Sequence, residues 1–195
     1  MPTRILILQG HPDPAGGHLN HALAEAYAEG ARAAGHEVRV VEVASLDVPL
    51  VRHKKEWDTA PVPEGLREAQ QAIAWAEHLV LFFPLWLGDM PAALKAFLEQ
   101  VLRPGFAVAP VPGPTMYRKL LGGRSARVVV TMGMPALVYR WVFRAHSLKA
   151  LERNILGFVG IAPVRETLVG RVGELDAAGV EGWRRTLRAL GRRAA

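Results

Sequence analysis

A buried strand, a loop rich in glycine and proline, and the start of a helix follow one another at the beginning of the chain. Residues 4–9 (RILILQ) form a short apolar run, and residues 10–17 (GHPDPAGG) end it at once. From residue 18 to about residue 34, apolar residues recur at three- and four-residue spacing, which is typical of an amphipathic helix. Such a unit places the unpaired N–H groups of a helix N-terminus beside glycines, where an anion can bind. A plain connection without a ligand is the alternative, and this stretch alone leaves both open.

Apolar runs and helical patterns continue to alternate along the chain. We expect further strands at residues 37–43, 78–83, 126–131 and 164–169, and helices at about 64–77, 91–102, 138–157 and 174–190. Strands that alternate with helices form a parallel sheet with right-handed crossovers and helices on both faces. The predicted fold class is therefore α/β, with a five-stranded parallel sheet in the order 2-1-3-4-5. No linker divides the chain, so we expect a single domain over residues 1–195.

In two stretches, the apolar residues show no clear helical or strand periodicity. Residues 44–63 are predicted to form a long surface excursion, and residues 103–123, with several prolines and glycines, are predicted to be irregular. Long segments without regular structure are unusual in a compact domain. The excursion at 44–63 is therefore expected either to be functional or to pack on a partner subunit.

Composition limits the chemistry that is open to the chain. It has no cysteine, which excludes disulfides, thiolate catalysis and cysteine-bound metals and fits a cytoplasmic protein. No cluster of histidines and carboxylates has metal-ligand spacing, so no metal site is expected. The net charge is +6, and 19 of the 24 basic residues are arginines. Because these arginines are spread over several elements, they indicate a positive field for anionic ligands, and we expect no nucleic-acid partner.

Three unusual loops are expected at the carboxyl ends of strands, at the point where the strand order of such a sheet reverses. They are residues 10–17, the apolar loop 84–90 and the loop 132–135. The first lacks both G-x-x-x-x-G-K and G-x-G-x-x-G, and the chain has no G-x-S-x-G. An anion loop beside an apolar aromatic loop and a glycine-containing loop suits the isoalloxazine ring of a flavin.

Several motifs in matching order resemble a known family. They are QGHPDP at 9–14, LNHAL at 19–23, FFPLW at 82–86, PAALKAF at 91–97, GFA at 105–107 and TMG at 131–133. Together they resemble the flavodoxin-like NAD(P)H:quinone oxidoreductases, a family that includes the ancillary oxidoreductases of bacterial potassium-efflux systems. The resemblance covers roughly residues 4–135.

The resemblance implies an enzyme with a flavin cofactor, FMN or FAD, and NAD(P)H as co-substrate. It implies a two-electron, ping-pong transfer of hydride to a quinone-type small molecule, and a homodimer whose partner helps to close the flavin site. A different class of function stays open. The chain could be a flavin-binding regulatory subunit of a membrane transporter, in which case a peripheral membrane partner is expected.

The resemblance also assigns site residues. By the resemblance, His11 is expected at the phosphate, and Leu19 and Asn20 are expected to line the same pocket. The residues of the first loop and helix start themselves add Gly17 and His18, although many members of the family carry Ser or Thr there. Those expected along the ring are Pro84, Leu85, Trp86 and Leu87, with the backbone N–H groups of the loop toward its N5 edge. Thr131 and Gly133 are expected at its pyrimidine side. Tyr139 and His146 are the catalytic candidates, seven residues apart on one predicted helix face. Ordinary packing is the alternative for Trp86, Tyr139 and His146.

Overall fold

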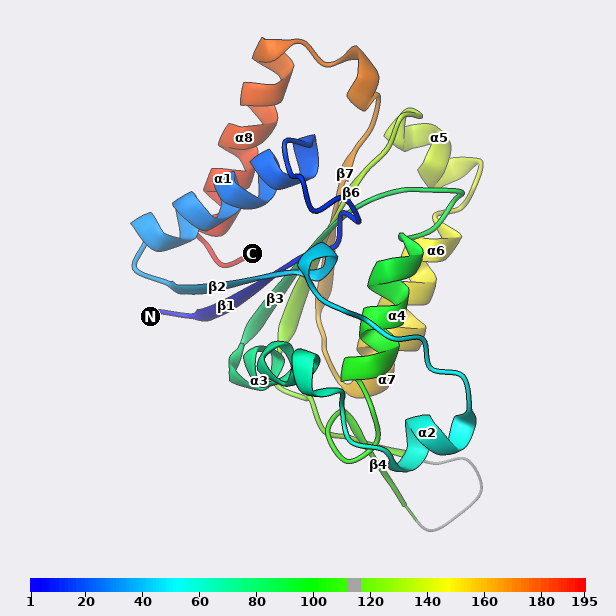
Figure 1. Ribbon diagram of the computed structural model, residues 1–195. Coiled ribbons are helices and arrows are strands. Elements are labelled where there is room, and N and C mark those ends of the chain that lie inside the picture. The colour runs from blue at the N-terminus through cyan, green and yellow to red at the C-terminus, as the bar shows by residue number, and fades with distance from the viewer. Residues whose placement is uncertain (112–116) are drawn as a thin grey trace.

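The centre of the molecule is a five-stranded parallel sheet in the order β2-β1-β3-β6-β7 (Figure 1). The computed structural model describes residues 1–111 and 117–195. The strands of this sheet are β1 (Arg4–Gln9), β2 (Glu37–Glu42), β3 (His78–Pro84), β6 (Ser125–Thr131) and β7 (Val164–Val169). The strand order is the one predicted. Only the numbering differs, because β4 (Val108–Pro110) and β5 (Tyr117–Lys119) pair antiparallel in a separate two-stranded sheet.

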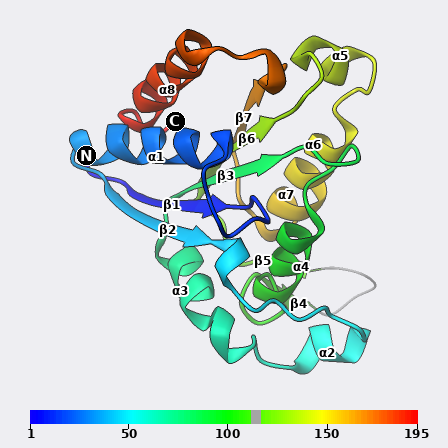
Figure 2. The ribbon, with the colours of Figure 1, turned by 45° about the horizontal axis from the view of Figure 1, so that its top comes forward.

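Helices cover both faces of the sheet. The helices are α1 (Leu19–Ala33), α2 (Lys54–Thr59), α3 (Arg67–Trp75), α4 (Ala92–Val101), α5 (Ala136–Trp141), α6 (His146–Ala150), α7 (Gly157–Val159) and α8 (Ala177–Gly191). Short 3-10 turns lie at Val43–Ser45, Glu64–Leu66 and Val172–Glu174, and a π-helical stretch lies at Leu151–Leu156. Figure 2 shows α1 and α8 together on one face and α3, α4 and α7 on the other. None of the helices in residues 1–111 and 117–195 is long and apolar enough to cross a membrane.

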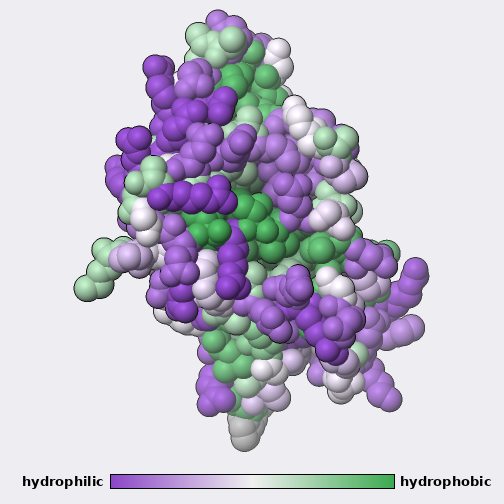
Figure 3. All heavy atoms as spheres, turned by 60° about the vertical axis from the view of Figure 1, so that its left-hand side comes forward, coloured by the Kyte–Doolittle hydropathy of each residue, from purple (hydrophilic) through white to green (hydrophobic). Residues whose placement is uncertain are grey.

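Successive side chains along each strand point to opposite faces of the sheet, so the core has two layers. On β1, Ile5 and Ile7 pack in the layer under α1 and α8, whereas Leu6 and Leu8 pack in the larger layer on the other face. All residues of β3 are buried, as expected for a central parallel strand that is covered on both sides. Figure 3, seen from the side of the edge strand β2, shows apolar surface surrounded by hydrophilic atoms.

The continuous helix predicted for residues 138–157 is wrong. Helix α5 ends at Trp141, and α6 begins only at His146. Between them Arg144 and Ala145 adopt left-handed backbone angles, with φ values of 54° and 47°. Residues other than glycine rarely adopt these backbone angles. Because neither Arg144 nor Ala145 is a glycine, the sequence shows no signal for the break.

The excursion at residues 44–63 is more ordered than predicted, because it contains α2 and is fastened to the core. The buried guanidinium of Arg103 donates hydrogen bonds to the backbone oxygens of Glu56 (2.8 Å) and Ala60 (3.1 Å). The other stretch predicted to be irregular, 103–123, contains β4 and β5, and its residues 112–116 lie outside the described part of the chain.

Helices α1 and α8 cross at two glycines. A Cβ atom on Gly30 would lie 2.1 Å from the carbonyl oxygen of Arg188, and one on Gly191 would lie 2.1 Å from the carbonyl oxygen of Tyr27. Either side chain would collide with backbone, which cannot move aside as a flexible side chain can. The absence of both Cβ atoms therefore sets how closely α8 approaches α1.

We expect Gly30→Ala to lower the free energy of unfolding by about 1–3 kcal/mol, because the added methyl group forces the two helices apart. The matched control is Gly182→Ala in α8, where no atom beyond the local helix backbone lies within 4 Å of the added Cβ. The control should be neutral or raise stability by about 0.5–1 kcal/mol through helix propensity. Urea unfolding of the two variants measures the difference. Equal stabilities would contradict this account of the crossing.

Candidate functional site

The loops that follow β1, β3 and β6 meet at the carboxyl edge of the sheet. The hydroxyl of Thr131, at the end of β6, donates to Oδ1 of Asn20 in the first turn of α1, at 2.5 Å. The backbone N–H of Leu85 donates to the carbonyl oxygen of Thr131 at 2.8 Å. The ring of His11 meets that of Trp86 edge-on, with 5.8 Å between centroids. These contacts join the three predicted loops in one site.

The first loop is shaped by backbone hydrogen bonds and by glycines. The N–H of Gly10 donates to the carbonyl oxygen of Phe82 at 2.7 Å, so the loop leaves the sheet close to β3. Gly16 and Gly17 adopt positive φ angles of 71° and 76°, a conformation that favours glycine. At the N-terminus of α1 no side chain caps the helix, so its first N–H groups have no side-chain acceptor. A Cβ atom added to Gly17 would meet no atom within 4 Å beyond its chain neighbours, so the space beside this residue is open.

Three imidazole rings gather around this loop. The rings of His11 and His18 stack with 3.9 Å between centroids, and the ring of His21 lies 5.4 Å from His11 and 5.7 Å from His18. Burial lowers the pKa of His11 below its usual value, and the neighbouring charges of His18 and His21 add to this effect. Nε2 of His18 lies 2.7 Å from Oδ2 of Asp13, and this hydrogen bond lowers the pKa of the Asp13 carboxyl.

Several buried polar atoms at the site have no hydrogen-bond partner within the described part of the chain. They are Nε2 of Gln9, Nδ2 of Asn20 and Nδ1 of His21. Gln9 and Asn20 are each only 2 % exposed. A buried donor without an acceptor costs about 1–3 kcal/mol, so such groups at a loop edge indicate a place where a ligand supplies the missing acceptor.

The second loop turns outward. Trp86 and Asp89 exchange two backbone hydrogen bonds, of 2.9 Å and 3.0 Å, around a two-residue turn in which Leu87 and Gly88 have φ angles of 48° and 82°. Trp86 is 51 % exposed and Leu87 fully exposed, whereas Met90 is buried in the core. The alternative that Trp86 is a core residue is therefore wrong. The expectation that the N–H groups of Leu85 and Trp86 face a ligand is also wrong, because both already have acceptors in the protein.

The remaining predicted residues lie at different depths. Pro84 is buried as the last residue of β3, Leu19 is half-buried as the first residue of α1, and Gly133 is exposed just beyond β6. Their exposure places Leu19 and Gly133 at the surface of the site, and Pro84 beneath it.

Tyr139 and His146 do not share a helix face, since α5 ends between them. Tyr139 is 2 % exposed, and its hydroxyl lies 2.8 Å from that of Ser147 and accepts from the N–H of Leu148. His146 is exposed at the start of α6. Ser147 and Trp86 line the same cavity of about 440 Å³, so Tyr139 reaches this cavity through Ser147.

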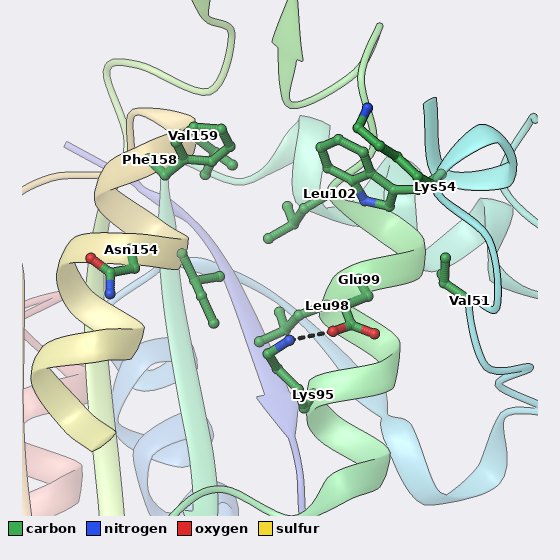
Figure 4. A pocket seen from close by; sticks show the side chains of 11 residues that line it. Val51, Lys54, Lys95, Leu98, Glu99, Leu102, Asn154, Phe158 and Val159 are labelled. Atoms are coloured by element: carbon green, nitrogen blue, oxygen red, sulfur yellow. Dashed lines mark hydrogen bonds and ion pairs between the residues drawn. The ribbon is translucent and has the colours of Figure 1, made fainter. Parts of the chain in front are cut away.

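A second cavity, of about 430 Å³, continues along α4 and shares Lys95 and Ile155 with the first. Figure 4 shows its apolar wall, including Leu98, Leu102 and Phe158, with Lys95 and Glu99 pointing toward one another as an ion pair. The excursion contributes Val51, Lys54 and Trp57 to this cavity. The sequence analysis did not predict this second cavity, although the amphipathic pattern of α4 is visible in the sequence.

Gln9, Asp13 and His21 were also missed as site residues. The signal for His21 was its position one helical turn from His18, and that for Gln9 was an amide at the end of a strand that is otherwise apolar. Within the part of the chain that the structure describes, no group of three or more His, Asp or Glu side chains is arranged to hold a metal ion.

Known proteins share this fold and parts of this sequence. A family model described as a flavodoxin-like fold matches residues 3–190. An uncharacterized NAD(P)H oxidoreductase of Haemophilus influenzae is 27 % identical over 131 residues, which cover 66 % of this chain and 64 % of that protein, so the match spans just under two thirds of its length.

Two solved structures extend the comparison. The NAD(P)H:quinone oxidoreductase from Methanothermobacter marburgensis is 25 % identical, with a TM-score of 0.81 over 99 % of this chain and 97 % of that one. An FMN-dependent NADH-azoreductase from Bacillus anthracis, solved in complex with FMN, is 17 % identical, with a TM-score of 0.74 over 97 % of this chain and 98 % of that one. The second likeness shows the fold alone.

The exposure of Trp86 leads to a prediction about stability. We expect Trp86→Ala to lower the free energy of unfolding by no more than about 1.5 kcal/mol, because half of the ring already contacts water. Phe82→Ala, at a fully buried position on β3, should cost about 3–5 kcal/mol. Chemical unfolding of the ligand-free variants tests this. A loss for Trp86→Ala as large as that for Phe82→Ala would show that the indole supports the core.

Proposed function

The chain belongs to the family with the flavodoxin-like fold, and from this premise we propose that it is a flavin-dependent NAD(P)H oxidoreductase that passes two electrons to a quinone-type acceptor. The observation that carries the proposal is the joining of the anion loop to the exposed apolar loop through His11 and Trp86. A ligand that has a phosphate group at one end and a flat aromatic ring at the other fits this juxtaposition.

The residues present suit a flavin. Its phosphate would lie in front of the first turn of α1, near His11, Gly17 and His18, with Leu19 beside it. The unpaired Nδ2 of Asn20 offers a donor there, and its Oδ1 is already held by Thr131. Backbone N–H groups at a helix N-terminus stabilise phosphate through both hydrogen bonds and the helix dipole.

The apolar ring would lie against the second loop. Trp86 and Leu87 offer exposed apolar surface, supported by Pro84 and Leu85 at the end of β3. Thr131 and Gly133 would border the polar side of the ring. When bound, the flavin would supply the redox chemistry, accepting hydride from NAD(P)H and releasing two electrons to the acceptor. We infer a ping-pong order in which NAD(P)H and acceptor use the same apolar surface in turn.

Tyr139 and His146 take different parts in the proposal. Tyr139 is a positioning residue, because its buried hydroxyl holds the Ser147 hydroxyl at the cavity that Trp86 also lines. The exposed imidazole of His146, one residue before Ser147, is the candidate for a proton donor to the acceptor. The cytoplasmic location, the homodimer and a peripheral membrane partner stay predictions from the sequence.

The proposal predicts a coloured protein with a defined activity. Denaturing the purified protein should release FMN or FAD, and the loaded protein should oxidise NADH or NADPH when a soluble quinone is supplied. Double-reciprocal plots at several quinone concentrations should be parallel, as ping-pong kinetics require. Failure to bind either flavin would contradict the proposal. Flavin binding without turnover of any quinone would instead favour the regulatory subunit.

Trp86→Ala should weaken flavin binding by about 10- to 100-fold. Removing about 100 Å² of ligand surface from water is worth roughly 2.5 kcal/mol, and each factor of ten in affinity corresponds to about 1.4 kcal/mol. The matched control is Trp141→Ala, at an exposed indole at the end of α5. Titration of each apoprotein with flavin should show a loss in the first variant alone. If Trp86→Ala binds flavin with unchanged affinity, the flavin ring does not lie against Trp86.

A further inference from the structure

The proposed phosphate site holds no permanently positive side chain of its own. Neither lysine nor arginine occurs between residues 5 and 31, which include the whole anion loop and most of α1. The basic groups that do lie there are the imidazoles of His11, His18 and His21. A phosphate monoester carries close to two negative charges at neutral pH. Any compensating charge from the loop side must therefore come from protons on these three rings.

The geometry of the cluster fixes where those protons are held. Nδ1 of His11 accepts a hydrogen bond from the N–H of Asp13 at 3.2 Å, so Nε2 is the donor of the neutral ring. His18 has its acceptor in the Asp13 carboxylate. Nδ1 of His21 is buried and lacks a partner within residues 1–111 and 117–195. The cluster thus offers one ring with a carboxylate already beside it, one neutral ring whose Nε2 is the donor, and one ring with a buried Nδ1 that has no partner among the described residues.

A second feature of the cluster is the close contact between its ionisable rings. His11 and His18 stack almost face to face, with 18° between their planes, and two charged rings in this position would repel one another. Burial and the charges of the two neighbouring histidines lower the pKa of His11. A phosphate dianion beside the rings acts in the opposite sense, since a nearby opposite charge favours the protonated form.

Resting on the flavin site proposed above, we infer that His11, His18 and His21 form a proton-linked phosphate clamp, in which binding of the cofactor's phosphate is accompanied by uptake of at least one proton from solution. The clamp selects phosphorylated flavin over the uncharged riboflavin, and it does so more strongly as the pH falls. His21, which neither the fold nor the family resemblance assigns to the site, is then a specificity-determining residue.

Other charged groups lie near the three histidines and contribute to the electrostatic potential at their rings. Asp13 lies in the loop itself, and its carboxyl has a lowered pKa and stays ionised near neutral pH. Glu25 and Arg32 on α1 and Glu42 at the end of β2 line a cavity of about 280 Å³ together with His21. Asp89 stands on the neighbouring loop beside Trp86. Substitution of the histidines alone leaves all of these charges in place.

The test compares FMN with riboflavin from pH 6.5 to 8.5 at constant ionic strength. Above pH 6.5 the phosphate itself is mostly a dianion, because its second pKa is about 6. The full chain, freed of flavin, should bind FMN more weakly as the pH rises, by up to about tenfold per pH unit for each proton taken up. Riboflavin affinity should not change. Calorimetry in buffers of different ionisation enthalpy should show proton uptake with FMN and none with riboflavin.

Variants assign the effect to the cluster. His18→Asn and His21→Asn should each weaken FMN binding at pH 6.5 by about tenfold and reduce the pH dependence, with riboflavin binding unchanged. The matched control, His53→Asn at the exposed N-cap of α2, should behave as the parent. Both cluster histidines are only half-buried, and His21→Gln serves as a second variant if the asparagine lowers the melting temperature.

Each other outcome counts against the clamp. If FMN binds equally well at pH 6.5 and 8.5, or without proton uptake, the clamp is wrong while the proposed function stands. The same holds if riboflavin shows the same pH dependence as FMN. If neither FMN nor FAD binds at any pH, both proposals fail.

Discussion

The hydrogen bond between Thr131 and Asn20 is the contact on which the site depends. It ties the end of a central strand to the first turn of α1, so the N-terminus of that helix is held against the sheet rather than left to fray. It occupies the oxygen of the amide and leaves the nitrogen unpaired, which directs a donor toward the loop. The same threonine accepts the N–H of Leu85 on its carbonyl oxygen. One residue thus fixes both the anion loop and the apolar loop.

The anion loop and most of α1 contain no lysine or arginine. Backbone N–H groups, an amide and imidazoles surround the place of the anion, and the many arginines of the chain lie on other elements, several of them in ion pairs such as Arg188 with Glu29. A fixed cation in the loop would attract any anion at any pH. A site without a fixed cation, in which positive charge is coupled to the ligand as proposed above, discriminates between anions by geometry as well as by charge.

The fold could be predicted from the sequence because apolar periodicity and strand–helix alternation determine it locally. The strand order and the meeting of the three loops followed from the rule that parallel strands present their carboxyl ends at one edge. The break between α5 and α6 could not be predicted, since Arg144 and Ala145 adopt positive φ angles that neither residue type signals. The turn at Leu87 is a similar case, and it decides that the N–H of Trp86 is satisfied internally. The order in the excursion depends on Arg103, a contact between segments distant in sequence.

The glycine crossing of α1 and α8 has a consequence for the order in which the molecule assembles. The contacts between these helices join segments about 160 residues apart, as the Arg188–Glu29 hydrogen bond illustrates with a separation of 159. Contacts of such long range form late, because the chain between them must first be ordered. During synthesis, α1 lacks its packing partner α8 until the residues of α8 have emerged from the ribosome. The close packing at Gly30 is therefore completed only after residue 191 has been synthesised.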